Sequence, residues 1–225
     1  MTDLRRFADL ASPSFFEVVP MRSLWSQGRA LLASTRDPTG FSELLGRVSD
    51  VLGRLGVPVV IGTEDESCAE QATTDPHQRG QWVLQLYFAQ LAQLGQAALD
   101  LRPARFHARR DRQGTAMMTW SPRPLAVAWD PAFIAGVRGL YSGFYRDDEA
   151  LFERSADALG LSMATDLFRQ QFGTGDQTAV RFELDRFKES FHQIFVRCRE
   201  HGVALHPNFV ALGIYLGGLY EHLDP

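Results

Sequence analysis

The stretch YFAQLAQLGQAALDLRPARF, residues 87–106, joins a helical pattern to a polar loop. Its first part continues an apolar spacing of three and four residues, which predicts a helix from Gln81 to Gly95. Its second part loses that period and predicts an extended segment that contains Asp100 and Arg102. A carboxylate in a loop that follows a helix makes Asp100 the first candidate functional residue.

The residues that follow this stretch predict a β-hairpin. Residues 98–109 are extended, residues 110–114 (RDRQG) form a turn, and residues 115–120 (TAMMTW) and 125–129 (LAVAW) are strand-like. The two prolines of the SPRP breaker cannot donate to a strand ladder, so we expect the strand to end there or to lie at an edge.

The C-terminal part of the chain reads as a series of helices. Asp130-Pro131 starts the first, with proline at its first position. Further helices are predicted at 149–160, at 178–202 and after Pro207. The apolar stripe of residues 178–202 indicates packing in the core or against another helix rather than a cofactor site.

The N-terminal part has the same helical character. Residues 24–34 and 41–56 place apolar residues three and four apart, and Gly56 closes the second helix. Residues 57–62 are rich in β-branched side chains and predict a buried strand. Residues 63–80 are polar, without a period, and predict a loop.

These patterns together predict an α+β fold that is mostly α-helical. Its sheet is expected to be small and antiparallel, formed near residues 57–62 and 97–129. We divide the chain into a helical N-terminal region with one short strand, residues 1–79, and a second unit, residues 80–225, which can also be one continuous domain with the first.

The composition is that of an ordinary globular protein. The chain has 225 residues, of which 45% are hydrophobic and 22% charged, so it can bury a sizeable core. A formal net charge of −4 gives no electrostatic reason to expect a nucleic-acid partner. We interpret the short basic run of the hairpin as a solvated rim; it consists of Arg105, Arg109, Arg110 and Arg112.

Targeting and cysteine usage point to the cytoplasm. The first residues have no apolar core of signal-peptide length, and the longest apolar run, residues 209–220, is too short to span a bilayer. Cys68 and Cys198 are the only cysteines and lie far apart in the sequence. We therefore expect neither a disulfide framework nor a structural zinc site.

The scarcity of lysine restricts the chemistry further. Lys188 is the only lysine of the chain, and it lies in the middle of a predicted helix. A Walker A loop requires Gly-Lys-Ser/Thr, and a kinase requires a strand lysine that holds the α- and β-phosphates of ATP. The sequence contains neither.

The run at 87–106 resembles the end of the catalytic-lobe helix and the catalytic loop of the AarF/UbiB-type atypical kinases. In that family a helix ending in a pattern like F-F-x-Q leads without gaps into H-A-D-x-H-P-G-N. The chain keeps Phe88, Gln90, Asp100 and Pro103 at matching positions. Because later segments follow in a similar order, the resemblance covers roughly residues 80–225 and implies a protein-kinase-like C-lobe. Four loop positions depart from the family pattern: Ala98, Arg102, Ala104 and Arg105.

The resemblance assigns a role to each loop residue. Asp100 corresponds to the aspartate that orients or deprotonates the acceptor hydroxyl. The family's loop asparagine and D-F-G aspartate hold Mg²⁺, whereas this chain has Arg105 and Trp120 there, which offer no oxygen ligand. Arg105 can still hold a phosphate through a bidentate contact. The expected ligand-binding residues are therefore Asp100, Arg102, Arg105 and Trp120.

The N-terminal region also lacks the parts of a kinase that cover ATP. It shows one convincing strand, no Gly-rich loop before a lysine, and no K-x-G-Q motif of the family. Together with the lost metal positions, these departures predict a pseudokinase. We expect a non-catalytic binding or regulatory module without a cofactor, whose partner is another protein or a small ligand.

Two alternatives remain open from the sequence. The first is a residual ATP-binding phosphotransferase or ATPase that uses Asp100 with carboxylates from elsewhere in the chain. The second is a helical metal-binding protein that uses Glu189 and His192, three positions apart on one helix face. Di-iron bundles use two such pairs and further carboxylates, and the sequence contains one pair.

Overall fold

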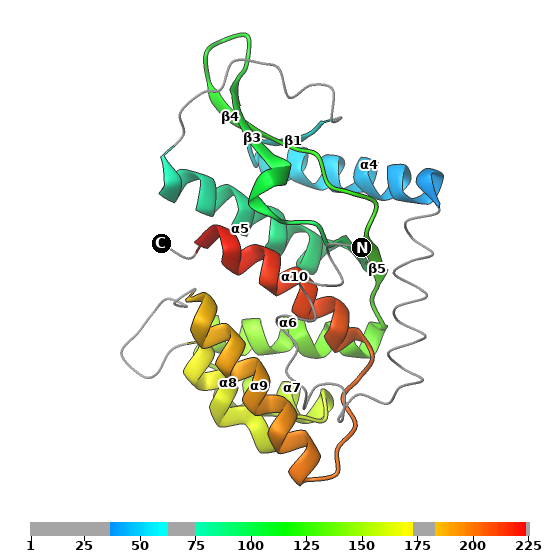
Figure 1. Ribbon diagram of the computed structural model, residues 1–225, viewed down its shortest axis with the longest axis vertical. Coiled ribbons are helices and arrows are strands. Elements are labelled where there is room, and N and C mark those ends of the chain that lie inside the picture. The colour runs from blue at the N-terminus through cyan, green and yellow to red at the C-terminus, as the bar shows by residue number, and fades with distance from the viewer. Residues whose placement is uncertain (1–36, 63–74, 173–182, 224–225) are drawn as a thin grey trace.

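The computed structural model describes residues 37–62, 75–172 and 183–223 (Figure 1). The helix predicted at 24–34, Cys68 and residues 178–182 of the helix predicted at 178–202 lie outside these ranges. Within them the chain is mostly helical and carries a small amount of sheet. The observed architecture agrees with an α+β fold at this level.

Helix α4 (Pro38–Leu55) and strand β1 (Val59–Ile61) form the first described part of the chain. The Asp37 side chain caps the helix by accepting a hydrogen bond from the Gly40 amide at 2.9 Å. Gly56 ends the helix in the left-handed conformation, with φ of 66°, where glycine carries no Cβ penalty. Both elements lie where the sequence predicted them, and their buried faces share one core with the rest of the molecule.

Helix α5 (Pro76–Gln93) begins five residues before its predicted start at Gln81. Asp75 caps it by accepting from the His77 amide at 3.2 Å, and Pro76 occupies the first turn. The expected loop is therefore shorter than residues 63–80. The first turn of α5 is polar, so apolar spacing alone could not locate it.

The strands form a three-stranded sheet and a separate two-stranded one. In the first, β3 (Phe106–Arg110) and β4 (Ala116–Trp120) make the predicted antiparallel hairpin. In the second, β2 (Gln96–Ala98) pairs antiparallel with β5 (Ala126–Ala128). The connection that contains both prolines of SPRP separates β4 from β5, as proline's missing N–H group requires.

The expectation of a wholly antiparallel sheet is wrong for β1. This strand pairs with β4 in parallel, in the register Val59↔Met118 to Ile61↔Trp120. The long connection from β1 to β4 contains α5, and parallel neighbours require a crossover of this kind rather than a tight turn. The sheet is therefore mixed, with β4 in its centre.

The remaining elements are helical: α6 (Pro131–Tyr145), α7 (Glu149–Ala158), α8 (Thr165–Phe172), α9 (Leu184–Glu200) and α10 (Asn208–Leu223). Helices α6 and α7 approach closely, since a Cβ on Gly143 would lie 2.7 Å from the Phe152 amide nitrogen. Figure 1 shows α10 between α5 and the group formed by α6, α7, α8 and α9. In the part of the chain that the structure describes, no helix combines the length and apolar character needed to cross a membrane.

Candidate functional site

Asp100 lies in the loop between β2 and β3, which ends in a short 3-10 turn (η2, Pro103–Arg105). Only 4% of Asp100 is exposed. Arg102 donates to both carboxylate oxygens, from Nε to Oδ1 at 2.5 Å and from Nη2 to Oδ2 at 2.6 Å. The Arg123 backbone amide donates to Oδ2 at 3.1 Å, and Arg105 Nε lies 3.4 Å from the same oxygen. We call these four residues the Asp100 clamp.

The local backbone explains how the clamp forms. Arg102 has an extended conformation, with φ of −61° and ψ of 144°, as expected for a residue before proline. Side chains two positions apart in an extended segment point to the same side, which brings the Arg102 fork onto Asp100. The 3-10 turn that follows then returns Arg105 to the same carboxylate.

Trp120 joins the same loop from the end of β4. Its indole Nε1 donates to the Asp100 backbone oxygen at 2.9 Å, and the side chain is completely buried. Its ring stacks on Phe106, with 6.0 Å between ring centres. The structure therefore brings together all four residues that the sequence nominated, but Trp120 belongs to the core and not to an open binding surface.

Gln90 ties the loop to two helices and explains why this position of α5 matters. The side chain is fully buried, and its Oε1 accepts from the Ala98 amide at 2.9 Å. Its Nε2 donates to the Tyr215 hydroxyl on α10, also at 2.9 Å. The sequence had singled out Gln90 by its spacing, whereas Tyr215 lies within the apolar run of residues 209–220 and gave no signal.

His222 is a second residue that the sequence did not nominate. It lies near the end of α10, and its ring packs edge-on against Phe106 at 4.7 Å. Burial and the nearby Arg79 guanidinium lower the pKa of His222 to about 4, while hydrogen bonds with the backbone of Leu101 and Arg102 act in the opposite direction. The histidine is therefore neutral at physiological pH and forms part of the packing beneath the loop.

The chemistry open to the clamp is limited. The carboxylate accepts hydrogen bonds from the Arg102 guanidinium and a backbone amide and forms an ion pair with Arg105, so it is poorly placed to take a proton from a ligand hydroxyl. Among the described residues, no group of three or more His, Cys, Asp or Glu side chains is arranged to hold a metal ion. The arrangement is suited to holding the loop in place.

Glu189 and His192 lie on α9 and are both exposed. Gln193 Nε2 donates to Glu189 Oε1 at 3.4 Å, a long hydrogen bond within the helix. Because no metal-binding group of three or more such side chains occurs in the described ranges, the pair has no further ligand there. Its position is that of an ordinary solvated helix face.

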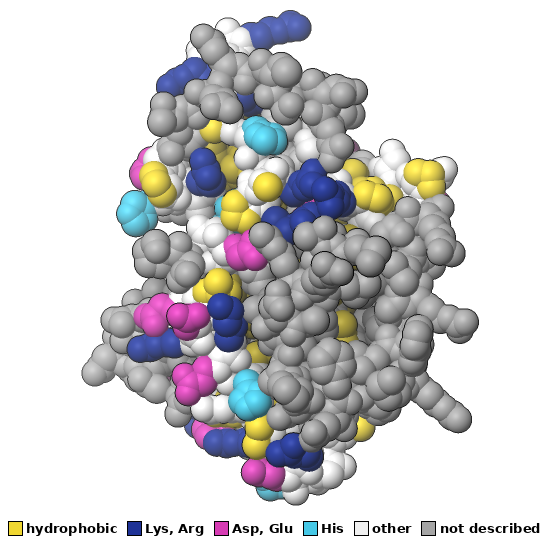
Figure 2. Space-filling model, viewed as in Figure 1, with side chains coloured by type: hydrophobic (Ala, Val, Ile, Leu, Met, Phe, Trp, Pro, Cys, Tyr) yellow, Lys and Arg dark blue, Asp and Glu magenta, His cyan; other side chains and the backbone are white. Residues whose placement is uncertain are grey.

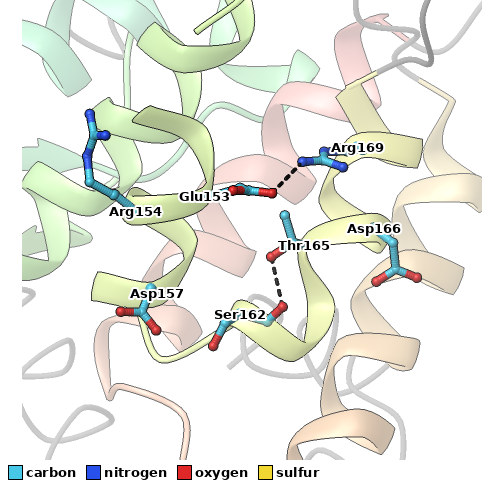
Figure 3. Close-up of a pocket in the computed structure, with 7 residues that line it drawn as sticks. All are labelled: Glu153, Arg154, Asp157, Ser162, Thr165, Asp166 and Arg169. Carbon is cyan, nitrogen blue, oxygen red and sulfur yellow. Dashed lines mark hydrogen bonds and ion pairs between the residues drawn. The ribbon is translucent and has the colours of Figure 1, made fainter. Parts of the chain in front are cut away.

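A separate cavity of about 590 Å³ lies between α7 and α8 (Figure 3). Arg169 reaches across it to Glu153 at 3.2 Å, and the Thr165 hydroxyl donates to the Ser162 carbonyl at 2.8 Å. Asp166 pairs with Arg197, whose hydrogen bond lowers the pKa of Asp166. The full lining is Glu153, Arg154, Asp157, Ser162, Thr165, Asp166 and Arg169. Glu153 and Asp166 are exposed and pair with Arg169 and Arg197, so the Asp100 clamp remains the candidate site.

Comparisons of the chain with models of protein families, with curated proteins and with solved structures give no match.

Proposed function

We propose that the protein is a non-catalytic, pseudokinase-like module that resembles the AarF/UbiB family and works in the cytoplasm by binding a protein or a small ligand. In this proposal the loop around Asp100 is the structural remnant of a catalytic loop. The module acts as a preformed scaffold rather than by phosphoryl transfer.

The order of elements around the loop supports the kinase-like part of the proposal. Helix α5 carries Gln90, the loop carries Asp100, and a hairpin with Gly114 in its turn then leads through β4 to Trp120. The family that the sequence resembles has a catalytic helix, a catalytic loop, a turn with glycine and an apolar strand in the same order. Two of the departures from the family pattern fall at its metal-binding positions, which Arg105 and Trp120 occupy.

The observation that carries the non-catalytic part is the bidentate contact of Arg102 with Asp100. A catalytic-loop aspartate must face the acceptor hydroxyl, and its neighbours must hold Mg²⁺ against the phosphates. Here the carboxylate is buried against arginine, and Trp120 at the second metal position is buried and bonded to the loop backbone. Both features oppose phosphoryl transfer at this site.

Titration of the wild-type protein with ATP and Mg²⁺, followed by calorimetry and thermal shift, tests the proposal. We expect no stabilisation by the nucleotide and no phosphate release above that of buffer. A stabilisation of several degrees that disappears in a folded Asp100→Asn variant would instead support the residual ATP-binding enzyme. Glu189→Gln is the matched control, since it also removes one carboxylate, from an exposed helix face.

A further inference from the structure

The β3–β4 hairpin carries three arginines close together in the sequence, Arg109, Arg110 and Arg112. Arg109 Nε donates to the Met117 sulfur at 3.1 Å, and Arg110 Nη1 donates to the Gly114 carbonyl at 2.8 Å. Arg112 in the turn is exposed. Within the described ranges none of these three side chains contacts a carboxylate, although the protein as a whole has a net charge of −4.

Asp111, the one acidic residue of the hairpin, forms hydrogen bonds with the backbone of the turn. Asp111 Oδ1 accepts from the amides of Gln113 and Thr115, both at 2.8 Å. These backbone hydrogen bonds, that from Thr115 first, lower the pKa of Asp111. Its charge therefore fixes the turn. On the face shown in Figure 2, dark blue side chains lie at several places in the upper part, and lower down dark blue and magenta side chains alternate.

The backbone of β3 is open on its outer side. The order β1-β4-β3 leaves β3 at an edge of the described sheet. Two bonds, from Ser121 N to Arg105 O at 2.9 Å and from Asp111 N to Thr115 O at 3.0 Å, show that the odd-numbered residues of β3 pair with β4. By strand alternation the N–H and C=O groups of Ala108 point away from β4. In the ranges that the structure describes they meet no partner.

We propose that this edge binds an extended acidic peptide, which adds a strand beside β3 while its carboxylates meet Arg109, Arg110 and Arg112. An open strand edge recognises a peptide backbone, and guanidinium groups that face no carboxylate in the described structure can select those of a peptide. The same charges repel a second copy of β3, so the surface favours an acidic partner over self-association. Phosphate polymers and anionic membranes would bind through the positive charge of the arginines alone and would not use the strand edge.

The proposal extends the proposed function by naming a partner, and it does not depend on the chemistry of Asp100. Its probe is a fluorescent peptide of about ten residues with alternating glutamate and threonine, measured by anisotropy at low ionic strength. We expect saturable binding of this peptide and none of a lysine-for-glutamate version. Binding should fall on the order of tenfold when Arg110→Glu and Arg112→Glu are combined.

Two further variants separate edge pairing from simple charge attraction. Ala108→Pro removes an N–H group that points away from β4, so the hairpin should fold while peptide binding is lost. A peptide methylated at alternate backbone nitrogens should also fail to bind. As a control, Arg186→Glu with Lys188→Glu makes the same change of charge on α9, where both residues face carboxylates, and should leave binding unchanged.

Several results would overturn the proposal. If the acidic peptide does not bind the wild-type protein, the arginines serve only to protect the edge from pairing. If the wild-type protein binds the methylated peptide as tightly as the unmodified one, the strand edge is not used. The same conclusion follows if the Ala108→Pro variant binds the unmodified peptide as tightly as the wild type does. Tighter binding of a single-stranded oligonucleotide or of phosphatidylserine vesicles would replace the peptide with a phosphate ligand. ATP turnover by the wild type would contradict the proposed function alone and leave this test intact.

Discussion

The Asp100 clamp and the β3–β4 hairpin both contain arginines a few residues apart, yet the two sets are used differently. Arg102 and Arg105 are mostly buried, with 17% and 14% of their side chains exposed, and they share the Asp100 carboxylate. Arg109, Arg110 and Arg112 border a strand edge and contact no carboxylate in the described structure. An arginine that is buried with a carboxylate holds the loop in place. An arginine that faces no carboxylate in the described structure can meet the carboxylate of a partner, as we propose for the hairpin.

Removal of the carboxylate from the clamp should have the strongest effect on folding. Asp100→Ala leaves two largely buried guanidinium groups without this carboxylate, which we expect to cost about 3 kcal/mol of unfolding free energy. Urea unfolding followed by circular dichroism measures it. Asp185→Ala removes the carboxylate of an exposed pair with Lys188 and should change stability by less than about 0.5 kcal/mol. Equal stability of the two variants would remove the contrast between buried and exposed arginine.

Acid should weaken the packing beneath the clamp through His222. Its pKa is about 4 in the folded protein, below the ordinary value of 6.5, so the unfolded chain binds the proton more tightly. Stability should therefore fall as pH decreases from 6.5 to 4, by at most about 1.4 kcal/mol per pH unit from this group.

The variant His222→Gln isolates this contribution. Its unfolding free energy should depend less steeply on pH across the same window, as measured by urea unfolding at several pH values. If the unfolding free energies of the wild type and of His222→Gln change with pH in parallel, then His222 is not buried in its neutral form.

Gln90→Leu should destabilise the protein by about 2 kcal/mol, because it leaves the Ala98 amide and the Tyr215 hydroxyl without their buried partner. Chemical unfolding measures the loss. Gln193→Leu, on the half-buried face of α9, removes only a long bond to Glu189 and serves as the comparison. A neutral Gln90→Leu would indicate that the loop is held by the arginines alone.

Charge reversal on the hairpin should have the smallest effect on folding. Arg110→Glu with Arg112→Glu changes exposed side chains without carboxylate contacts in the described structure, so we expect a stability change within about 0.5 kcal/mol. Thermal unfolding of the folded variant measures it. A large loss would mean that these arginines support the fold, as those of the clamp do.

Local sequence signals predicted most helices and the hairpin, because caps and periodicity act over a few residues. Gly56 and Asp130 mark helix ends in the sequence and do so in the structure. The parallel pairing of β1 with β4 could not be predicted in this way, since it joins residues about 60 positions apart, beyond the reach of any local pattern. Helix α8 has eight residues and was missed because so short a helix shows little periodicity.

The candidate site was predicted as a set of residues but not as an arrangement. The sequence named Asp100, Arg102, Arg105 and Trp120, and the structure places them together. It did not predict that Arg102 bonds to Asp100, although the extended conformation before Pro103 favours that contact. Tyr215 and His222 were missed because contacts across α10 depend on tertiary packing.

A double-mutant cycle between Asp100 and Arg102 tests most directly whether the aspartate is structural. The unfolding free energies of the wild type, Asp100→Ala, Arg102→Ala and the double variant give the coupling between the two side chains. The clamp predicts a coupling of about 2 kcal/mol, with the double variant more stable than Asp100→Ala alone. A coupling near zero would contradict the clamp and favour the alternative in which Asp100 serves a residual ATP-binding enzyme.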